Sequence, residues 1–278
     1  MGYLTLMRPF VCLSAAGAAF AGIGALGFPL DAPSVAALTI LSNFLLTGGA
    51  DAINDYFDRE IDKVNMPARP IPSGRVSPRG AALFAAALFA AGNLAAWRVN
   101  WMLGTLASTG TLISIAYGAY SKRLGLLKNF IIAATAATSL LLAGAALERS
   151  NAALWAAGAH LFFMMMGVEL SKDVEDMPGD RAFGARTWAL KVGAERATRA
   201  AGACVAAGLI AVAAAGAAGA ARGVFFWPLF AASALMAGWP FFFPVRKPHL
   251  IFCATALGVA AVIAGAFDAE RGAAFFSK

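Results

Sequence analysis

The sequence predicts an all-helical membrane protein, and three observations support that fold class. Hydrophobic residues make up 60% of the 278 positions and charged residues only 13%, and the mean hydropathy is +0.71. A soluble domain normally carries about a quarter charged residues. The apolar stretches have about the 20 residues that a helix needs to cross the hydrocarbon core. The 29 glycines are typical of membrane helices that approach one another closely.

We expect nine transmembrane helices in a single domain over residues 1–278. The first apolar stretch is too long for the core of a signal peptide, so it is expected to remain as a helix. The expected helices span residues 4–28, 35–57, 78–97, 100–120, 128–147, 152–171, 197–221, 225–243 and 249–267.

The basic residues predict the orientation of these helices. With the N-terminus inside, most of the 22 Lys and Arg fall in cytoplasmic segments, as the positive-inside rule requires. Trp97, Trp101, Trp155 and Trp227 lie beside the expected exterior turns, where an aromatic belt is found. We therefore expect an integral, multi-pass protein of the cell membrane with a cytoplasmic N-terminus. Topology accounts for the net charge of +7, and no nucleic-acid partner is expected.

Acidic residues concentrate in two segments, from Asp51 to Asp62 and from Glu169 to Asp180, which hold ten of the 15 Asp and Glu. Three aspartates in each segment repeat the spacing D-x-x-D-x-x-x-D, which on a helix places the carboxylates on one face. These aspartates are Asp55, Asp58, Asp62, Asp173, Asp176 and Asp180. Both segments end an even-numbered expected helix, so both are expected on the cytoplasmic side, in one site.

The repeated spacing favours a metal site over a merely solvated loop. Carboxylates three and four residues apart repel one another, and a divalent cation relieves that repulsion. Mg²⁺ is typically held by one or two carboxylates together with substrate phosphates and water. Arg69, Lys122 and Lys172 lie near the acidic segments, and such side chains bind phosphate oxygens. Positive-inside topology alone could also explain each of them. The pattern as a whole indicates a metal-dependent diphosphate site.

At these residues the chain resembles the UbiA superfamily of intramembrane prenyltransferases. The first motif reads N-D-Y-F-D-R-E-I-D at residues 54–62 and continues through R-P-I-P-S-G at 69–74. The second reads K-D-V-E-D-M-P-G-D at residues 172–180. The resemblance implies a helical bundle around a central cavity, two Mg²⁺ ions, and transfer of a prenyl chain from its diphosphate to a lipid acceptor. No obligate protein partner is expected.

The resemblance also implies roles for individual residues. Asn54 and Asp58 would hold one Mg²⁺, and Asp176 and Asp180 the other. Further metal candidates are Asp55, Asp62 and Asp173. The diphosphate candidates are Arg8, Asn54, Arg69 and Lys122, and the catalytic candidates are Asp58, Asp62, Glu169, Lys172 and Asp173. The metals and cations would neutralise the departing diphosphate, so that the allylic C–O bond can ionise.

The second motif also bears on the acceptor. It is most similar to the archaeal-type enzymes that join geranylgeranyl diphosphate to geranylgeranylglyceryl phosphate in ether-lipid synthesis. Quinone-making members usually carry Tyr where this chain has Glu169, and an anionic side chain offers a poor stacking face to an aromatic acceptor. Glu169 is expected either to assist a glycerol hydroxyl or to pair with Lys172. The stretch at 69–74 is also similar to chlorophyll synthases, so an aromatic or tetrapyrrole acceptor stays open.

Two other classes fit the sequence less well. A CDP-alcohol phosphotransferase would show a single D-G-x-x-A-R block and fewer helices. A cation-coupled transporter would place its acids near the bilayer midplane in broken helices, whereas here they fall at the expected ends of helices.

Overall fold

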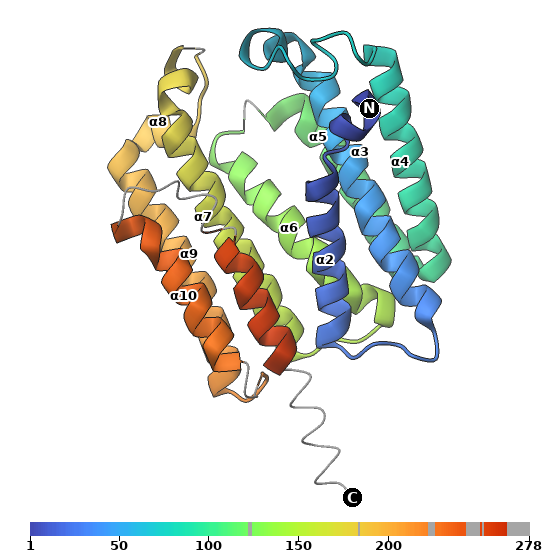
Figure 1. Cartoon of the computed structure of the whole chain (residues 1–278), viewed down its shortest axis with the longest axis vertical. Coiled ribbons are helices and arrows are strands. Elements are labelled where there is room, and N and C mark those ends of the chain that lie inside the picture. The colour runs from blue at the N-terminus through green and yellow to red at the C-terminus, as the bar shows by residue number, and fades with distance from the viewer. Residues whose placement is uncertain (122–123, 183, 222–225, 243–250, 252, 266–278) are drawn as a thin grey trace, which may run out of the picture. The chain divides into compact units, whose positions relative to one another are not determined.

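The computed structural model describes residues 1–121, 124–182, 184–221, 226–242, 251 and 253–265, and this part of the chain is helical with no strand (Figure 1). The helices are α1 (Gly2–Leu6), α2 (Pro9–Ala25), α3 (Pro33–Asn65), α4 (Pro78–Val99), α5 (Trp101–Tyr120), α6 (Leu126–Leu147), α7 (Ala152–Ala182), α8 (Trp188–Val192), α9 (Ala194–Ala217), α10 (Phe226–Phe242) and a last one, Cys253–Gly265.

The chain divides into two compact units. The first unit comprises Met1–Phe20, Phe28–Ser121 and Ala145–Glu148, and the second comprises Ala21–Gly27, Lys122–Gly144 and Arg149–Lys278. The first acidic motif therefore belongs to the first unit and the second motif to the second unit.

In the first unit, α3, α4 and α5 pack against one another, and α1 contacts α3 and α4 (Figure 1). The segment between α3 and α4 is held down by two apolar side chains, Ile71 and Val76, which belong to the same buried cluster as Leu6, Ala52 and Phe89. At Ser77 the side chain accepts a hydrogen bond from the Gly80 amide and caps α4, as N-cap serines do. This anchoring fixes the segment that carries Arg69.

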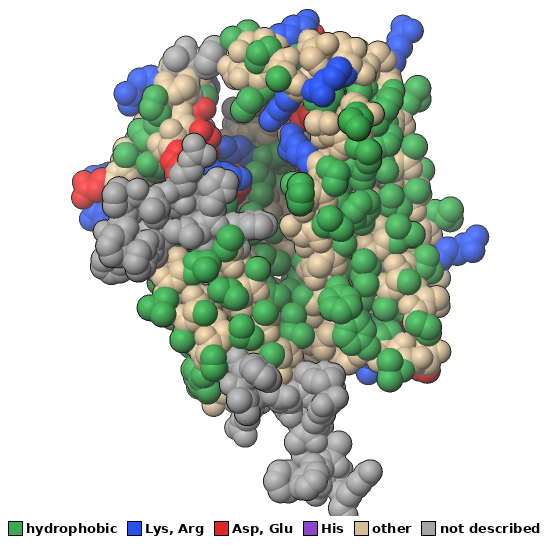
Figure 2. Space-filling view, viewed as in Figure 1, with side chains coloured by type: hydrophobic (Ala, Val, Ile, Leu, Met, Phe, Trp, Pro, Cys, Tyr) green, Lys and Arg blue, Asp and Glu red, His purple; other side chains and the backbone are tan. Residues whose placement is uncertain are grey.

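The outward faces of the first unit are apolar. Leu83 and Leu94 on α4 and Leu112 on α5 are all more than half exposed, which suits contact with lipid. Figure 2 shows hydrophobic side chains along these helices and Lys and Arg gathered mostly near one end. Between α4 and α5, Asn93 donates to Thr111 and accepts from Ser108; polar links of this kind join helices within a bilayer.

In the second unit, α7 packs along α9, α8 contacts both, and α10 contacts α9 (Figure 1). Gly167 allows the close approach of α7 to α9, because a Cβ there would lie 2.7 Å from a methyl group of Val205. His160 on α7 is fully buried, and its Nδ1 lies 2.9 Å from the carbonyl oxygen of Gly208 on α9. The upper part of α7, which carries the second motif, is thereby held on a packed helix pair.

The helices agree with the sequence prediction in order, with three differences at their boundaries. The expected helix 4–28 is broken between α1 and α2, where Arg8 has a positive φ of 49° and precedes Pro9. The expected ends at residues 57 and 171 were wrong: α3 continues to Asn65 and α7 to Ala182. Both helices continue because their acidic residues find cationic partners instead of ending the helix. Parts of the last two expected helices lie outside the described residues.

Five of the described helices are long and apolar enough to cross a membrane: α3, α4, α6, α7 and α9. Helix α2, α10 and the last helix are apolar but shorter. The expectation of nine spanning helices therefore stays a prediction.

Candidate active site

The first motif lies on the C-terminal half of α3, on a face that is largely buried. Asp55 and Asp62 are only 4% and 5% exposed. Asp51 and Asp58 lie four residues before and three residues after Asp55, and both are partly buried. Buried carboxylates are costly unless they are paired and hydrogen-bonded. The burial of this face therefore requires cationic partners from outside α3.

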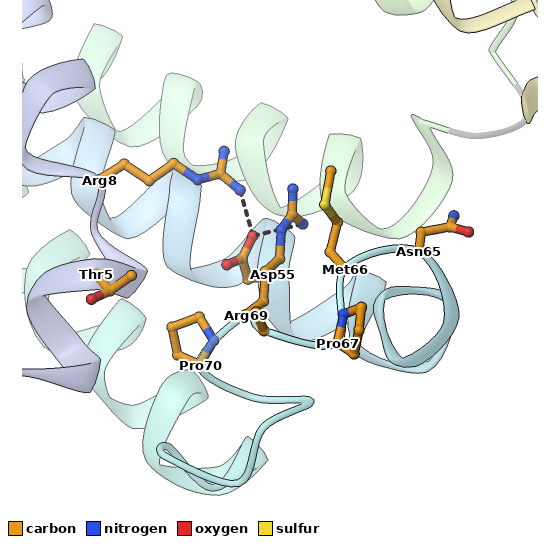
Figure 3. Close-up of a pocket in the computed structure, with 9 residues that line it drawn as sticks. Thr5, Arg8, Asp55, Asn65, Met66, Pro67, Arg69 and Pro70 are labelled. Carbon is orange, nitrogen blue, oxygen red and sulfur yellow. Dashed lines mark hydrogen bonds and ion pairs between the residues drawn. The ribbon is translucent and has the colours of Figure 1, made fainter.

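Two arginines supply these partners. Arg8 bridges two carboxylates, with Nη1 2.9 Å from Asp51 Oδ1 and Nη2 2.5 Å from Asp55 Oδ1. Arg69 bridges the next two, with Nη1 3.3 Å from Asp55 Oδ1 and 2.6 Å from Asp62 Oδ2. Figure 3 shows both guanidinium groups directed at Asp55. Two cations and three carboxylates thus form one continuous network, which we call the arginine network (Arg8, Arg69, Asp51, Asp55 and Asp62).

Local structure sets the positions of both arginines. Arg8 lies in the break between α1 and α2, where its φ of 49° is uncommon for a residue other than glycine. The α conformation is disfavoured before a proline, so Pro9 contributes to the break. Arg69 lies in the segment after α3, and its carbonyl accepts a hydrogen bond from the Ser73 hydroxyl at 2.7 Å. Each guanidinium is thus presented by a non-helical backbone segment.

The two arginines and Asp55 line a cavity of about 440 Å³, together with Thr5 and the residues 65–68 and Pro70 (Figure 3). Its size falls in the range of small-molecule sites, about 300–1,000 Å³. Arg8 and Arg69 are about one-third exposed, so their charged ends remain accessible. Guanidinium groups bind phosphate oxygens in bidentate fashion, and the cavity can therefore accept an anion.

Two oxygens of this motif have no hydrogen-bond partner. They are Asn54 Oδ1 and Asp51 Oδ2, and both are buried. Within the described residues, no three side chains of His, Cys, Asp or Glu gather closely enough to form a metal site alone. Since Mg²⁺ typically takes one or two carboxylates plus phosphate oxygens and water, the residues present fit an ion that binds together with a diphosphate.

The second motif lies on α7 and is neutralised differently. Asp173 is 3% exposed; Lys128 Nζ lies 2.8 Å from its Oδ1, and Asn129 Nδ2 donates to its Oδ2 at 2.9 Å. Both partners belong to the first turns of α6. Asp176 is exposed and Asp180 is partly exposed. The three aspartates of the repeated spacing therefore have different surroundings.

Glu169 pairs with a residue of its own helix. Lys172 Nζ lies 2.6 Å from Glu169 Oε1, and the Glu169 side chain is 8% exposed, compared with 49% for Lys172. This pairing is one of the two roles that the sequence left open for Glu169. Lys172 is therefore engaged on the same helix, in the part of the chain that the structure describes.

The structure thus brings together some of the predicted site residues and adds others. Arg8, Arg69, Asp55 and Asp62 meet in the first unit. Lys122, a diphosphate candidate, lies outside the described residues. Sequence reasoning missed Lys128 and Asn129 as partners of Asp173, and it assigned no separate role to Asp51. An Asn and a Lys at the start of an apolar helix were the available signal, because polar residues in membrane helices need partners.

A helical membrane fold with a cationic cavity and acidic helical motifs defines the class of protein. The sequence profile described as the UbiA prenyltransferase family matches residues 10–254. The chain belongs to the UbiA prenyltransferase family, and it is a multi-pass membrane enzyme that transfers prenyl groups.

Particular relatives narrow the comparison. Digeranylgeranylglyceryl phosphate synthase of Methanothrix thermoacetophila is 40% identical over 187 residues, which cover 67% of this chain and 70% of that protein. A solved structure described for digeranylgeranylglyceryl phosphate synthase in membranes has a TM-score of 0.76 at 24% identity, covering 96% of this chain and 98% of its own. A UbiA homolog from Archaeoglobus fulgidus, bound to GPP and Mg²⁺, has a TM-score of 0.71 at 23% identity and covers 97% and 99%. The two solved structures share the fold of this chain.

Proposed function

We propose that this enzyme transfers a geranylgeranyl group from geranylgeranyl diphosphate to geranylgeranylglyceryl phosphate, in a reaction that depends on Mg²⁺. The observation that carries the proposal is the cavity in which Arg8 and Arg69 approach Asp55 within 2.5 and 3.3 Å. The acceptor is inferred from the 40% identical relative and its name. The family profile covers both compact units, which supports one prenyltransferase domain over residues 1–278.

In the proposed site, the diphosphate binds to the guanidinium groups of Arg8 and Arg69. Both arginines now neutralise carboxylates of α3, so binding of an anion would draw them away from Asp55 and Asp62. These carboxylates, with Asp58 and the unpartnered amide oxygen of Asn54, would then be available to a divalent ion. Arginine and metal would thus alternate at the same oxygens.

We assign the second ion to Asp176 and Asp180 on α7, because these two carboxylates are at least partly exposed. Two ions would neutralise charge on the departing diphosphate and so lower the barrier to breaking the allylic C–O bond. In the products, the acceptor oxygen is bonded to the allylic carbon, and its proton has been released. Glu169, which accepts a hydrogen bond from Lys172, is proposed to receive a hydrogen bond from that hydroxyl.

The residues of the cavity suit this chemistry better than a transport cycle. A cation carrier places its ligands in broken helices at the bilayer midplane, whereas Asp51 to Asp62 occupy the last turns of the continuous helix α3. We also propose that the N-terminus and both acidic motifs face the cytoplasm. Cysteines introduced at Ser73 and Arg181, in a background lacking the native ones, should resist an impermeant thiol reagent outside intact cells, while one at Asn151 should react.

Product analysis by mass spectrometry tests the proposed reaction. Purified protein is incubated with geranylgeranyl diphosphate, Mg²⁺ and either geranylgeranylglyceryl phosphate, 4-hydroxybenzoate or a chlorophyllide. We expect the doubly prenylated glycerol phosphate and an equal amount of inorganic diphosphate. Prenylation of only an aromatic or tetrapyrrole acceptor would show that the acceptor assignment is wrong, and no diphosphate release from any mixture would exclude the transferase.

A further inference from the structure

The carboxylate of Asp173 has both oxygens engaged by one neighbouring helix. Lys128 Nζ lies 2.8 Å from Oδ1, and Asn129 Nδ2 lies 2.9 Å from Oδ2. Asp173 is 3% exposed and Asn129 is fully buried. All three residues belong to the second unit, so this contact ties the start of α6 to α7. We call Asp173, Lys128 and Asn129 the α6 anchor.

Asn129 is an unusual residue for its position. Its amide oxygen is buried and accepts no hydrogen bond. A buried polar atom without a partner is unfavourable, and an apolar side chain of similar size would avoid that cost. The amide group that donates to Asp173 is therefore the feature that Asn129 contributes. The two helices also touch elsewhere, through the edge-to-face pair of Phe130 and Phe162 with ring centroids 5.3 Å apart, so the anchor is not needed merely to bring α6 and α7 together.

The anchor makes Asp173 a poor ligand for a metal ion. An ammonium group 2.8 Å from one carboxylate oxygen repels a divalent cation at the same carboxylate, and most strongly where burial lowers the dielectric. Asp176 and Asp180, three and seven residues further along α7, are at least partly exposed. The spacing that makes the three aspartates look equivalent therefore joins one anchored and two accessible carboxylates.

We propose that Lys128 and Asn129 are positioning residues that hold Asp173 against α6 and thereby orient the turns of α7 carrying Asp176 and Asp180. Asp173 acts as the fixed point of the second motif and does not bind the ion. This inference rests on the proposed function, in which Asp176 and Asp180 hold a divalent ion. Groups that orient ligands in this way typically change metal affinity by about 10- to 100-fold when they are removed.

Titration of the purified full-length protein with Mn²⁺, followed by electron paramagnetic resonance, tests the proposal. Lys128→Gln and Asn129→Leu should each raise the Mn²⁺ concentration for half-saturation about tenfold, with the number of bound ions unchanged. Lys128→Arg should restore most of the affinity. Arg199→Met is the matched control, because it removes an exposed pair with Glu195 on α9 of the same unit and should leave Mn²⁺ binding unaltered.

The sign of the change distinguishes the anchor from a direct ligand. If Asp173 bound the ion, removal of the competing ammonium in Lys128→Gln would tighten Mn²⁺ binding, and Asp173→Asn would lose one bound ion; either result would overturn the proposal. Unchanged Mn²⁺ affinity with only a lower unfolding temperature would also overturn it, since the contact would then be purely structural. Should Lys128→Gln fail to fold, Asn129→Leu and Asp173→Asn decide the question. Wild-type protein that neither binds Mn²⁺ nor forms product would refute the proposed function and the anchor together, whereas a normal wild type with unchanged variants would refute the anchor alone.

Discussion

The two acidic motifs have the same aspartate spacing but are neutralised by different means. On α3, Arg8 and Arg69 come from non-helical segments and bridge Asp51, Asp55 and Asp62 in one network. On α7, a lysine and an asparagine of α6 hold Asp173, and in the described part of the chain no arginine pairs with Asp176 or Asp180.

This difference separates two functions within one sequence pattern. In the arginine network each cation shares two carboxylates and keeps about a third of its surface accessible, so an anion can compete for it. In the α6 anchor the carboxylate is buried and its partners are fixed by a helix. A repeated motif can therefore supply an exchangeable charge network in one unit and a rigid support in the other.

The largest effect is expected from loss of the metal ligands that we assign in each motif. Asp58→Ala and Asp176→Ala should each lower the rate of prenyl transfer about 10³-fold, because a catalytic metal contributes several kcal/mol of transition-state stabilisation. EDTA should abolish the activity of the wild type and Mg²⁺ should restore it. Glu60→Ala is the control on α3, since Glu60 is 68% exposed and pairs only with Arg59 and Lys63 of its own helix. Full turnover in chelator would contradict the metal assignment.

A smaller effect, mainly on KM, is expected in the arginine network. Arg69→Gln should raise KM for the prenyl diphosphate about 10- to 100-fold, since a hydrogen bond to a charged group contributes about 1.5–3 kcal/mol. The variant also leaves Asp62 buried without its partner, so its unfolding temperature should fall. Adding Asp62→Asn should recover the unfolding temperature but not KM. Recovery of both would show that Arg69 serves the fold and not the substrate.

The role of Glu169 should appear in turnover alone. Glu169→Gln should lower kcat with the acceptor about tenfold or more, in line with the contribution of a side chain that assists proton transfer, and leave KM for the prenyl diphosphate unchanged. Steady-state kinetics with each substrate varied in turn would separate these terms. An unaltered kcat would leave Glu169 with the ion pair to Lys172 as its only function.

The smallest effect is expected at the exposed pair of the second motif. Lys172→Met removes an ion pair in which the lysine side chain is 49% exposed, and such surface pairs contribute about 0–1 kcal/mol. Lys128→Met leaves the charge of Asp173 buried and should cost about 3 kcal/mol or more. Denaturation of the two variants in the same detergent measures the difference. Equal losses would contradict the distinction between anchored and exposed carboxylates.

Much of this architecture could be predicted from the sequence, because apolar length and small residues determine membrane helices directly. Arg8, Arg69 and the aspartates could be proposed as site residues from composition and resemblance. The ends of α3 and α7 could not be predicted, since the charges that suggested an end are instead paired with residues far away in the chain, such as Arg8 with Asp51 and Lys128 with Asp173. The inequivalence of Asp173 and Asp176 was also hidden, because spacing reveals a shared face but not which helix covers it.

The central claim is that cations have opposite relations to metal binding in the two motifs. A side-by-side Mn²⁺ titration of wild type, Arg69→Gln and Lys128→Gln, without diphosphate, tests it most directly. Arg69 competes with the ion for Asp55 and Asp62, so Arg69→Gln should bind Mn²⁺ more tightly than wild type, while Lys128→Gln should bind it more weakly. Changes of the same sign in both variants would contradict the account.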